Sequence, residues 1–384
     1  MITTISTITG DYAILTVNTS LTGNNTSLYT RAGLFMTTIP HNQSHANDQV
    51  LLYQLNFPNL NFIGLYCDIA PSGIGYVCVI EISTNQTQST YAKVDFLTSA
   101  SVTQITLLNN KPDISKTGIT FQGLGMQAMA FGGYIFYAMN QNNGYYYIWA
   151  YDENNNPIGQ VGGGYPTNKY AANALYNHIN QNNLNAANGI MRNNNTFILA
   201  SSTPATTTSW SLYKIPLPMV IHDNGYGNIQ VVKIDPSPID KELTSISGTV
   251  DATTNTLSIT FRNPVILSTG SITIYKNSDK TMRQKILATM HDHVRYIDNN
   301  HTIVNIDIIS STFNQYGEKY YMQMDANFVR DEKLYEPLVG IDEGIVNYKS
   351  SNIFANIPRP SEESAIYVAR LTVKKKTNIN RLFN

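Results

Sequence analysis

The stretch 256-TLSITFRNPVILSTGSITIYK-276 indicates the fold class of this chain. From Leu257 to Phe261, apolar residues alternate with Ser and Thr. After a break at 268-STG-270, the alternation resumes at Ile272 and Ile274. A period of two is typical of a strand with one buried face, and Gly marks a turn. The stretch therefore predicts a half-buried antiparallel pair of strands.

Strand-like runs also recur in pairs through the first part of the chain. Each apolar run leads through a polar tip into a second run that contains aromatic residues, and no run has a helical period. The predicted pairs are 12–17 with 28–36, 62–69 with 75–82, 134–139 with 145–152, and 196–202 with 209–217. Repeated hairpins of this kind predict an all-β architecture, propeller-like or sandwich-like, and we favour propeller-like repeats.

The part that follows the opening stretch is denser in short strands. Alternating runs are predicted at 285–290, 293–297, 302–309, 319–328 and 344–349. Strands this short and this close together are typical of a seven-stranded Ig-like β-sandwich of about 100 residues.

The charged residues divide the chain into two parts. Residues 1–235 carry 8 Lys or Arg and 10 Asp or Glu, whereas residues 236–384 carry 17 and 16. The composition changes beside the proline-rich segment 234-IDPSPID-240, which is typical of a domain boundary. We therefore expect a propeller-like domain over 1–233, an Ig-like sandwich over 234–350, and a C-terminal tail over 351–384.

Composition narrows the classes of partner. The 384 residues are 42% hydrophobic, enough to fill a core, but only 13% charged, against roughly 25% in an average domain. A net charge of −1 does not favour a nucleic acid or an anionic membrane as partner. Surfaces rich in Asn, Thr and Tyr are commoner outside cells, so protein or glycan ligands at a surface are the expected partners.

The sequence shows neither a membrane span nor a signal peptide, which conflicts with the surface location that the composition favours. No apolar run approaches the roughly 18 residues of a membrane span. The N-terminal segment MITTISTITGDYAILTV lacks the basic start and continuous apolar core of a signal peptide. The chain is therefore expected either to be intracellular or to begin downstream of the true start, and we favour the second reading.

The C-terminal part resembles a known family. An apolar ITF strand is followed by a Pro-Val pair, by 270-GSITIY-275 and by 312-TFNQYGEKYYMQMDANFV-329. This order is similar to that of the SbsA-type Ig-like domain, a module of surface-layer and other cell-surface proteins. The matching positions are Phe261, Pro264, Val265, Gly270, Ile272, Ile274, Phe313, Tyr320, Tyr321 and Asp325. The resemblance covers Ile234 to Lys349. It implies an extracellular spacer with no catalytic residues.

The two cysteines are placed to meet across a hairpin. If the chain turns at Ser72–Gly73, residues whose numbers sum to 145 face each other, and Cys67 and Cys78 are such a pair. Directly opposed cysteines on antiparallel strands lie close enough to form a disulfide. We expect the bridge if the chain is secreted, and two buried free thiols if it is cytosolic.

Two further sets of residues are candidates for modification or binding. The sequence Asn-x-Ser/Thr, which is compatible with glycosylation, occurs at Asn18, Asn24, Asn25, Asn42, Asn85, Asn194 and Asn300. Alternation places Tyr145, Tyr147, Trp149 and Tyr151 on one face of a strand. Aromatic faces of this kind stack on sugar rings, but packing between sheets is the interpretation that we favour for them.

Metal and catalytic motifs are weak. His291 and His293 form an H-x-H pair with His301 nearby, and surface positions are the expected reading. The segment 152-DENNNP-157 lacks the Gly and the Glu of a calcium loop, so it predicts a turn. No recurring acidic motif, nucleophile elbow or nucleotide fingerprint is present. We therefore predict no catalytic, metal or cofactor site.

These observations predict a non-catalytic, extracellular or cell-surface protein with a structural or adhesive role. The alternative is a propeller protein that binds or cleaves carbohydrate. Cleavage is favoured if three or more acids converge on one central cavity. A third reading is an intracellular scaffold for protein partners, favoured if Cys67 and Cys78 are reduced and the protein carries no glycan.

Overall fold

The computed structural model confirms the all-β prediction. It describes residues 1–18, 32–41, 43–55, 60–85, 88–108, 121–140, 146–154, 156–161, 187–191, 195–202, 210–222, 224–237 and 248–351. All the regular structure in these ranges is β-strand. Within the same ranges, no helix is long and apolar enough to cross a membrane.

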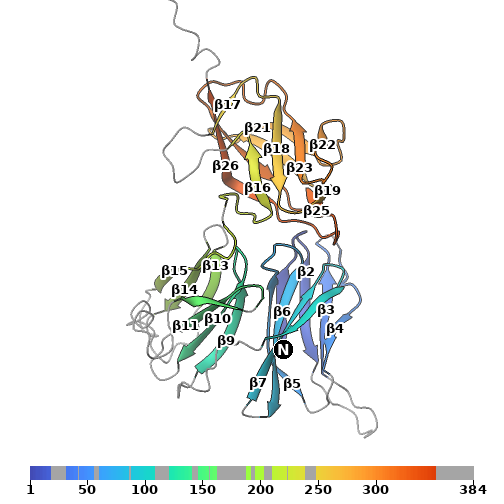
Figure 1. Cartoon of the computed structure of the whole chain (residues 1–384), viewed down its shortest axis with the longest axis vertical. Helices are drawn as coiled ribbons and strands as arrows, with labels where there is room; N and C mark the ends of the chain where they lie inside the picture. Colours follow the sequence, from blue (N-terminus) through green and yellow to red (C-terminus); the bar gives the residue numbers. More distant parts are fainter. Residues whose placement is uncertain are drawn as a thin grey trace, which may run out of the picture.

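The described residues of the N-terminal part form four antiparallel sheets in which the strands follow chain order (Figure 1). The first sheet contains β1 (Ile2–Ser6), β2 (Tyr12–Asn18), β3 (Gly33–Ile39) and β4 (Val50–Gln54). The second contains β5 (Asn61–Ile69), β6 (Tyr76–Asn85), β7 (Gln88–Phe96) and β8 (Val102–Leu107). The third contains β9 (Phe121–Ala128), β10 (Tyr134–Asn140), β11 (Tyr146–Tyr151) and β12 (Pro157–Val161). The fourth contains β13 (Ala187–Met191), β14 (Thr196–Ser202) and β15 (Trp210–Pro216).

Each pair of neighbouring sheets shares a hydrophobic core. Leu15 of the first sheet packs in one cluster with Ile80 of the second. Val79, on the other face of β6, packs with Phe136 of the third sheet. Ile148 of the third sheet then packs with Phe197 of the fourth. Successive residues of a strand point to opposite faces, so the continuous apolar runs of β6 and β10 let the second and third sheets bury both faces.

In the C-terminal part, the described residues form two larger sheets that pack on one core and a small two-stranded sheet beside them (Figure 1). The two larger sheets and their core are here called the sandwich. One sheet has the order β16 (Val231–Asp235), β18 (Thr256–Phe261), β23 (Ile303–Asp307) and β22 (Val294–Tyr296). The other has the order β17 (Thr249–Asp251), β26 (Ile341–Ser351), β24 (Lys319–Met324), β20 (Ser271–Lys276) and β21 (Met282–Leu287). The small sheet pairs β19 (Val265–Leu267) with β25 (Val329–Asp331).

The stretch 256–276 forms strands as predicted, but these strands do not pair with each other. β18 pairs with β16 and β23, whereas β20 pairs with β21 and β24 in the opposite sheet. β19 intervenes between them, so the chain crosses from one sheet to the other. The predicted hairpin is therefore wrong, because alternation identifies a half-buried strand without identifying its neighbour.

The four predicted N-terminal hairpins are confirmed. β2 pairs with β3, β5 with β6, β10 with β11, and β14 with β15. The first strand of the C-terminal sheets, β16, begins at Val231, slightly before the boundary predicted at Ile234. The predicted tail lies outside the described residues beyond Ser351.

The sandwich is joined to the second sheet by buried polar contacts. Glu336 is 4% exposed, and its carboxylate accepts hydrogen bonds from the Thr98 backbone N–H at 3.0 Å and the Thr98 hydroxyl at 2.8 Å. The Gln230 side chain donates to the Ser72 carbonyl, and Ile74 packs against the sandwich core. Both contacts use loops of the second sheet, so the sandwich is anchored to one sheet of the N-terminal part.

The buried carboxyl group of Glu336 makes the stability of the protein depend on pH. Burial raises the pKa of Glu336 above its ordinary value of 4.5, an effect partly offset by the Thr98 hydrogen bonds and by Arg330. The native state then binds more protons than the unfolded state above pH 4.5. The stability from Glu336 is therefore full below that pH and is lost as the pH rises through the raised value.

Glu336→Gln is expected to gain stability relative to the wild type between pH 4 and pH 7, because the Gln amide does not titrate. Its oxygen can accept from the Thr98 backbone N–H, and its NH2 group can donate to the Thr98 hydroxyl. Thermal unfolding of the two proteins at both pH values measures this difference. Glu336→Ala is the control, because it removes the Thr98 hydrogen bonds and should be less stable at both. A constant difference between the Gln variant and the wild type across the range would contradict the prediction.

Candidate functional site

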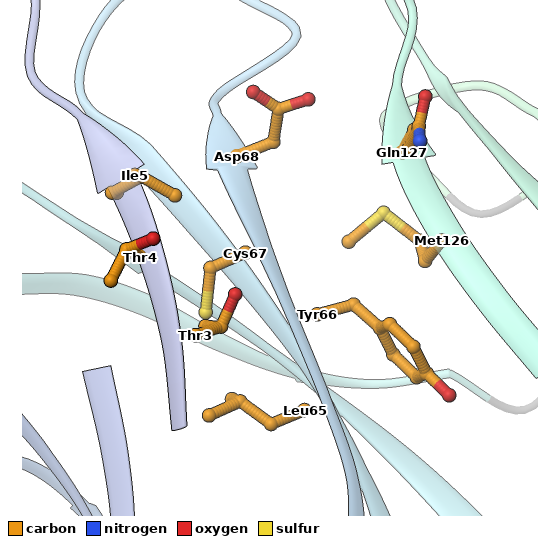
Figure 2. Close-up of a pocket in the computed structure, with 9 residues that line it drawn as sticks. All are labelled: Thr3, Thr4, Ile5, Leu65, Tyr66, Cys67, Asp68, Met126 and Gln127. Atoms are coloured by element: carbon orange, nitrogen blue, oxygen red, sulfur yellow. The ribbon is translucent and has the colours of Figure 1, made fainter. Parts of the chain in front are cut away.

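The first strands of three N-terminal sheets surround a pocket of about 410 Å³ (Figure 2). β5 lies between β1 and β9, and contacts both. The pocket is lined by Thr3, Thr4, Ile5, Leu65, Tyr66, Cys67, Asp68, Met126 and Gln127. Its volume falls within the roughly 300–1,000 Å³ typical of small-molecule sites.

The polar groups of the pocket come from all three strands. β1 supplies the hydroxyls of Thr3 and Thr4, β5 supplies the carboxylate of Asp68, and β9 supplies the amide of Gln127. Asp68 Oδ1 accepts the Ile69 backbone N–H at 2.7 Å, which holds this carboxylate at the end of β5. In Figure 2, Asp68 and Gln127 lie toward one end of the pocket.

Tyr66 gives the pocket an aromatic wall from the middle of β5. Burial, the Glu81 carboxylate and Tyr137 raise the pKa of Tyr66 to about 12. Burial and Glu81 also raise the pKa of Tyr91, whose hydroxyl hydrogen-bonds to Glu81. Tyr66 is therefore a neutral phenol at physiological pH, able to donate as well as accept a hydrogen bond.

Lys93 and Asp95 of β7 form an ion pair on the side of the second sheet that faces the third. Lys93 Nζ lies 3.3 Å from Asp95 Oδ2, and Lys93 is 8% exposed. Lys93 Nζ also donates to the Glu153 carbonyl on the neighbouring sheet at 3.4 Å. Burial raises the pKa of Asp95 more than the Lys93 ammonium lowers it. The pair joins the two sheets next to the aromatic core and does not line the pocket.

A disulfide joins Cys67 and Cys78 in the wall of the pocket, with their Cα atoms 4.1 Å apart. The two residues are direct partners in the β5–β6 register, as are Tyr66 with Val79 and Asp68 with Val77. This is the register in which the residue numbers sum to 145. The short Cα distance is that of a non-hydrogen-bonded pair, where the side chains approach most closely.

Two of the candidate stacking aromatics are covered by protein. Trp149 is 7% exposed and Tyr151 is 4% exposed, and both pack with Val79 and Tyr91 of the second sheet. Their faces are therefore used between sheets, which corrects the alternative that they stack on a ligand. Tyr147 lies in β11, but its side chain is not among those described, and Tyr145 lies outside the described residues.

The glycosylation candidates are only partly covered by the structure. Asn300 is exposed in the turn before His301. Asn18 and Asn85 end β2 and β6, and their side chains are not among those described. The other candidates lie outside the described residues: Asn24, Asn25, Asn42 and Asn194.

The candidate histidines do not converge. His291 and His293 are exposed in the turn before β22, and His293 Nδ1 lies 3.6 Å from Asp307. His301 stacks on Tyr296 with its Nδ1 2.7 Å from Glu332. In the part of the chain that the structure covers, no group of three or more His, Cys, Asp or Glu could hold a metal ion.

The described residues of the segment 152–157 form a turn at Asp152–Asn154 and Asn156, before β12 begins at Pro157, as predicted. Asp152 Oδ1 accepts the backbone N–H groups of Asn154 and Asn156 at 2.9 and 2.7 Å. The Asp152 backbone N–H donates to the Asn156 carbonyl at 3.0 Å. The carboxylate therefore closes the turn through its own backbone.

Sequence reasoning identifies Cys67 but none of the other residues that line the pocket. From the sequence alone, Asp68 is an acid in a hairpin strand, for which exposure at a sheet edge is the plain explanation. No protein-family model matches the chain, and no curated protein matches it either. A functional proposal therefore depends on the residues of this chain and their geometry.

Proposed function

We propose that this protein is a non-catalytic structural and adhesive protein that works at a cell surface or outside the cell. Its N-terminal part is propeller-like and carries the ligand pocket between β1, β5 and β9. Its C-terminal part is an Ig-like spacer of the SbsA type, held against the N-terminal part through Glu336 and Gln230.

The observation that carries this proposal is the Cys67–Cys78 disulfide in the wall of the pocket. Disulfides persist in oxidising compartments and are rare in the cytosol. The bridge fixes β5 to β6, and β5 supplies Leu65, Tyr66 and Asp68 to the pocket. A binding pocket that is held in shape by a disulfide fits a protein that meets its ligand outside the cell.

Strand order supports the Ig-like spacer. With β16, β18, β22 and β23 as strands A, B, D and E, the first sheet has the order A-B-E-D. With β20, β21, β24 and β26 as C, C′, F and G, the second sheet contains the order G-F-C-C′. These orders match those of the two sheets of an Ig-like sandwich and so support the assignment.

The arrangement of the N-terminal sheets supports the propeller-like part. Propeller blades are four-stranded antiparallel sheets arranged around a central channel. Here three successive sheets have four strands in chain order, neighbouring sheets share cores, and the first strands meet at the pocket.

Surface labelling of intact source cells tests the location. A membrane-impermeant amine reagent is expected to modify exposed lysines such as Lys233 and Lys280, or the protein is expected in the medium. A cytosolic protein that stays unlabelled is the control. Labelling only after lysis would contradict the proposal and favour the intracellular scaffold.

Incubation with neutral oligosaccharides tests the non-catalytic assignment. Glycosidases ordinarily use a pair of carboxyl groups about 5–9.5 Å apart. Among the described residues that line the pocket, Asp68 is the one carboxylate. The proposal expects unchanged oligosaccharides by mass spectrometry, and hydrolysis products would contradict it.

A further inference from the structure

The pocket between β1, β5 and β9 has a composition that selects a class of ligand. Its polar groups are two hydroxyls, one primary amide, one phenol and one carboxylate, on Thr3, Thr4, Gln127, Tyr66 and Asp68. The described residues that line it include no Lys or Arg. This set offers hydrogen-bond donors and acceptors together, but no positive charge for a phosphate or a carboxylate ligand.

The donor and acceptor groups match those of a polyol. Each hydroxyl of a sugar both donates and accepts, as do the Thr hydroxyls and the Gln127 amide. The Asp68 carboxylate accepts hydrogen bonds only, and hydrogen bonds to a charged acceptor are the stronger ones. Polar groups that come from three separate strands favour a ligand with hydroxyls on several sides.

The apolar part of the wall complements the C–H faces of a sugar ring. Figure 2 shows Met126 and Tyr66 below the end that holds Asp68 and Gln127. Ile5 and Leu65 are buried beside the pocket and supply further apolar wall. Most ligand pockets combine an apolar lining with a few polar groups that fix orientation.

We infer that this pocket binds a neutral saccharide unit of a glycan, a conclusion that rests on the proposed adhesive function and names its ligand class. Asp68 and Gln127 hold the sugar hydroxyls at one end of the pocket, and Thr3 and Thr4 hold them from β1. Tyr66 and Met126 contact the face of the sugar ring. A primary amine is the competing ligand, because Asp68 carries a negative charge. Four of the five polar groups are neutral, however, and favour hydroxyls.

Binding of the full chain to immobilised neutral oligosaccharides is the test, with Nα-acetyl-lysine methylamide as the amine probe. We expect saturable binding to at least one oligosaccharide, with an affinity that is unchanged between low and high salt because the ligand carries no charge. Binding of the amine alone, weakened by salt, or no binding to any oligosaccharide would overturn the inference.

Matched variants locate the binding. Asp68→Ala and Gln127→Ala are each expected to weaken the affinity at least about tenfold, as expected for the loss of hydrogen bonds to the ligand. Asp48→Ala and Gln104→Ala, at exposed positions outside the pocket, should leave it unchanged. Thr4→Ala, at an exposed position of β1, is a further pocket variant in case the others fold poorly, and thermal unfolding checks each fold. If the pocket variants and the control variants bind the oligosaccharide with equal affinity, the assignment of binding to this pocket is overturned.

The outcomes separate this inference from the proposed function. A protein that is labelled on intact cells but binds no neutral oligosaccharide keeps its surface location and loses the saccharide site. A protein that binds an oligosaccharide through Asp68 and Gln127 but is labelled only after lysis keeps the site and loses the surface function.

Discussion

Replacing Gly340 by Ala is expected to destabilise the sandwich by about 3 kcal/mol or more, because the new methyl group has no space. A Cβ at this position would overlap the Met324 carbonyl oxygen and lie 2.8 Å from the Ala326 backbone nitrogen. These are backbone atoms at the end of β24, where Met324 pairs with Ile341, the first residue of β26. The two strands must separate to admit the methyl group.

Thermal unfolding followed by circular dichroism measures this effect, with a drop of about 10 °C expected in the transition of the sandwich. Gly344→Ala, in the strand that begins directly after Gly340, is the matched control. Gly344 has a φ of +78°, and a methyl group there would meet nothing within 4 Å, so its substitution should cost only about 1 kcal/mol of backbone strain. Similar melting temperatures for the two variants would contradict the close approach at Gly340.

Replacing Cys67 and Cys78 together by Ala is expected to lower the free energy of unfolding by about 2–4 kcal/mol. The disulfide restricts the unfolded chain, and it also joins neighbouring strands in the core between the first two sheets. Ala is the appropriate replacement because Cys78 is fully buried, and a Ser hydroxyl there would need a hydrogen-bond partner.

Urea unfolding with and without a reducing agent isolates the contribution of the bridge. The reducing agent should bring the wild type close to the stability of the double-Ala variant and leave that variant unchanged. A wild type whose unfolding is the same in both conditions would show that the bridge contributes nothing to stability. The variant should also bind oligosaccharide more weakly, because β5 carries Tyr66 and Asp68 into the pocket.

The sequence predicts local pairing better than long-range pairing, and a comparison of the β5–β6 hairpin with β18 and β20 shows why. The β5–β6 hairpin could be predicted to the residue, because a short turn fixes the register that opposes Cys67 to Cys78. β18 and β20 have equally clear alternation, but they do not pair with each other, and each has a partner more distant in the chain, β23 and β24 respectively. Alternation reports which face is buried and gives no information on which strand lies alongside.

The pocket could not be predicted for the same physical reason. Its residues come from three strands far apart in sequence, at 3–5, 65–68 and 126–127. Thr and Gln are common throughout this chain and form no motif at these positions. By contrast, Trp149 and Tyr151 attract attention as aromatics, and their burial between sheets follows from the preference of large rings for a packed core.

Composition alone places the boundary between the two parts slightly too late in the chain. Charge density and prolines place it at Ile234, whereas β16 starts at Val231 and pairs with β18 along its length. Val231 and Ile234 are both fully buried in the sandwich core. In composition β16 resembles the strands that precede it, so only its pairing with β18 assigns it to the sandwich.

The redox state of the two cysteines in protein isolated from its natural source decides between a surface protein and an intracellular one. The protein is extracted without a reducing agent, treated with an alkylating reagent under denaturing conditions, and weighed intact by mass spectrometry. We expect no added alkyl group, and two after prior reduction, because the Cys67–Cys78 disulfide of a surface or secreted protein stays oxidised. Two alkyl groups without prior reduction would contradict the proposed function and favour an intracellular scaffold.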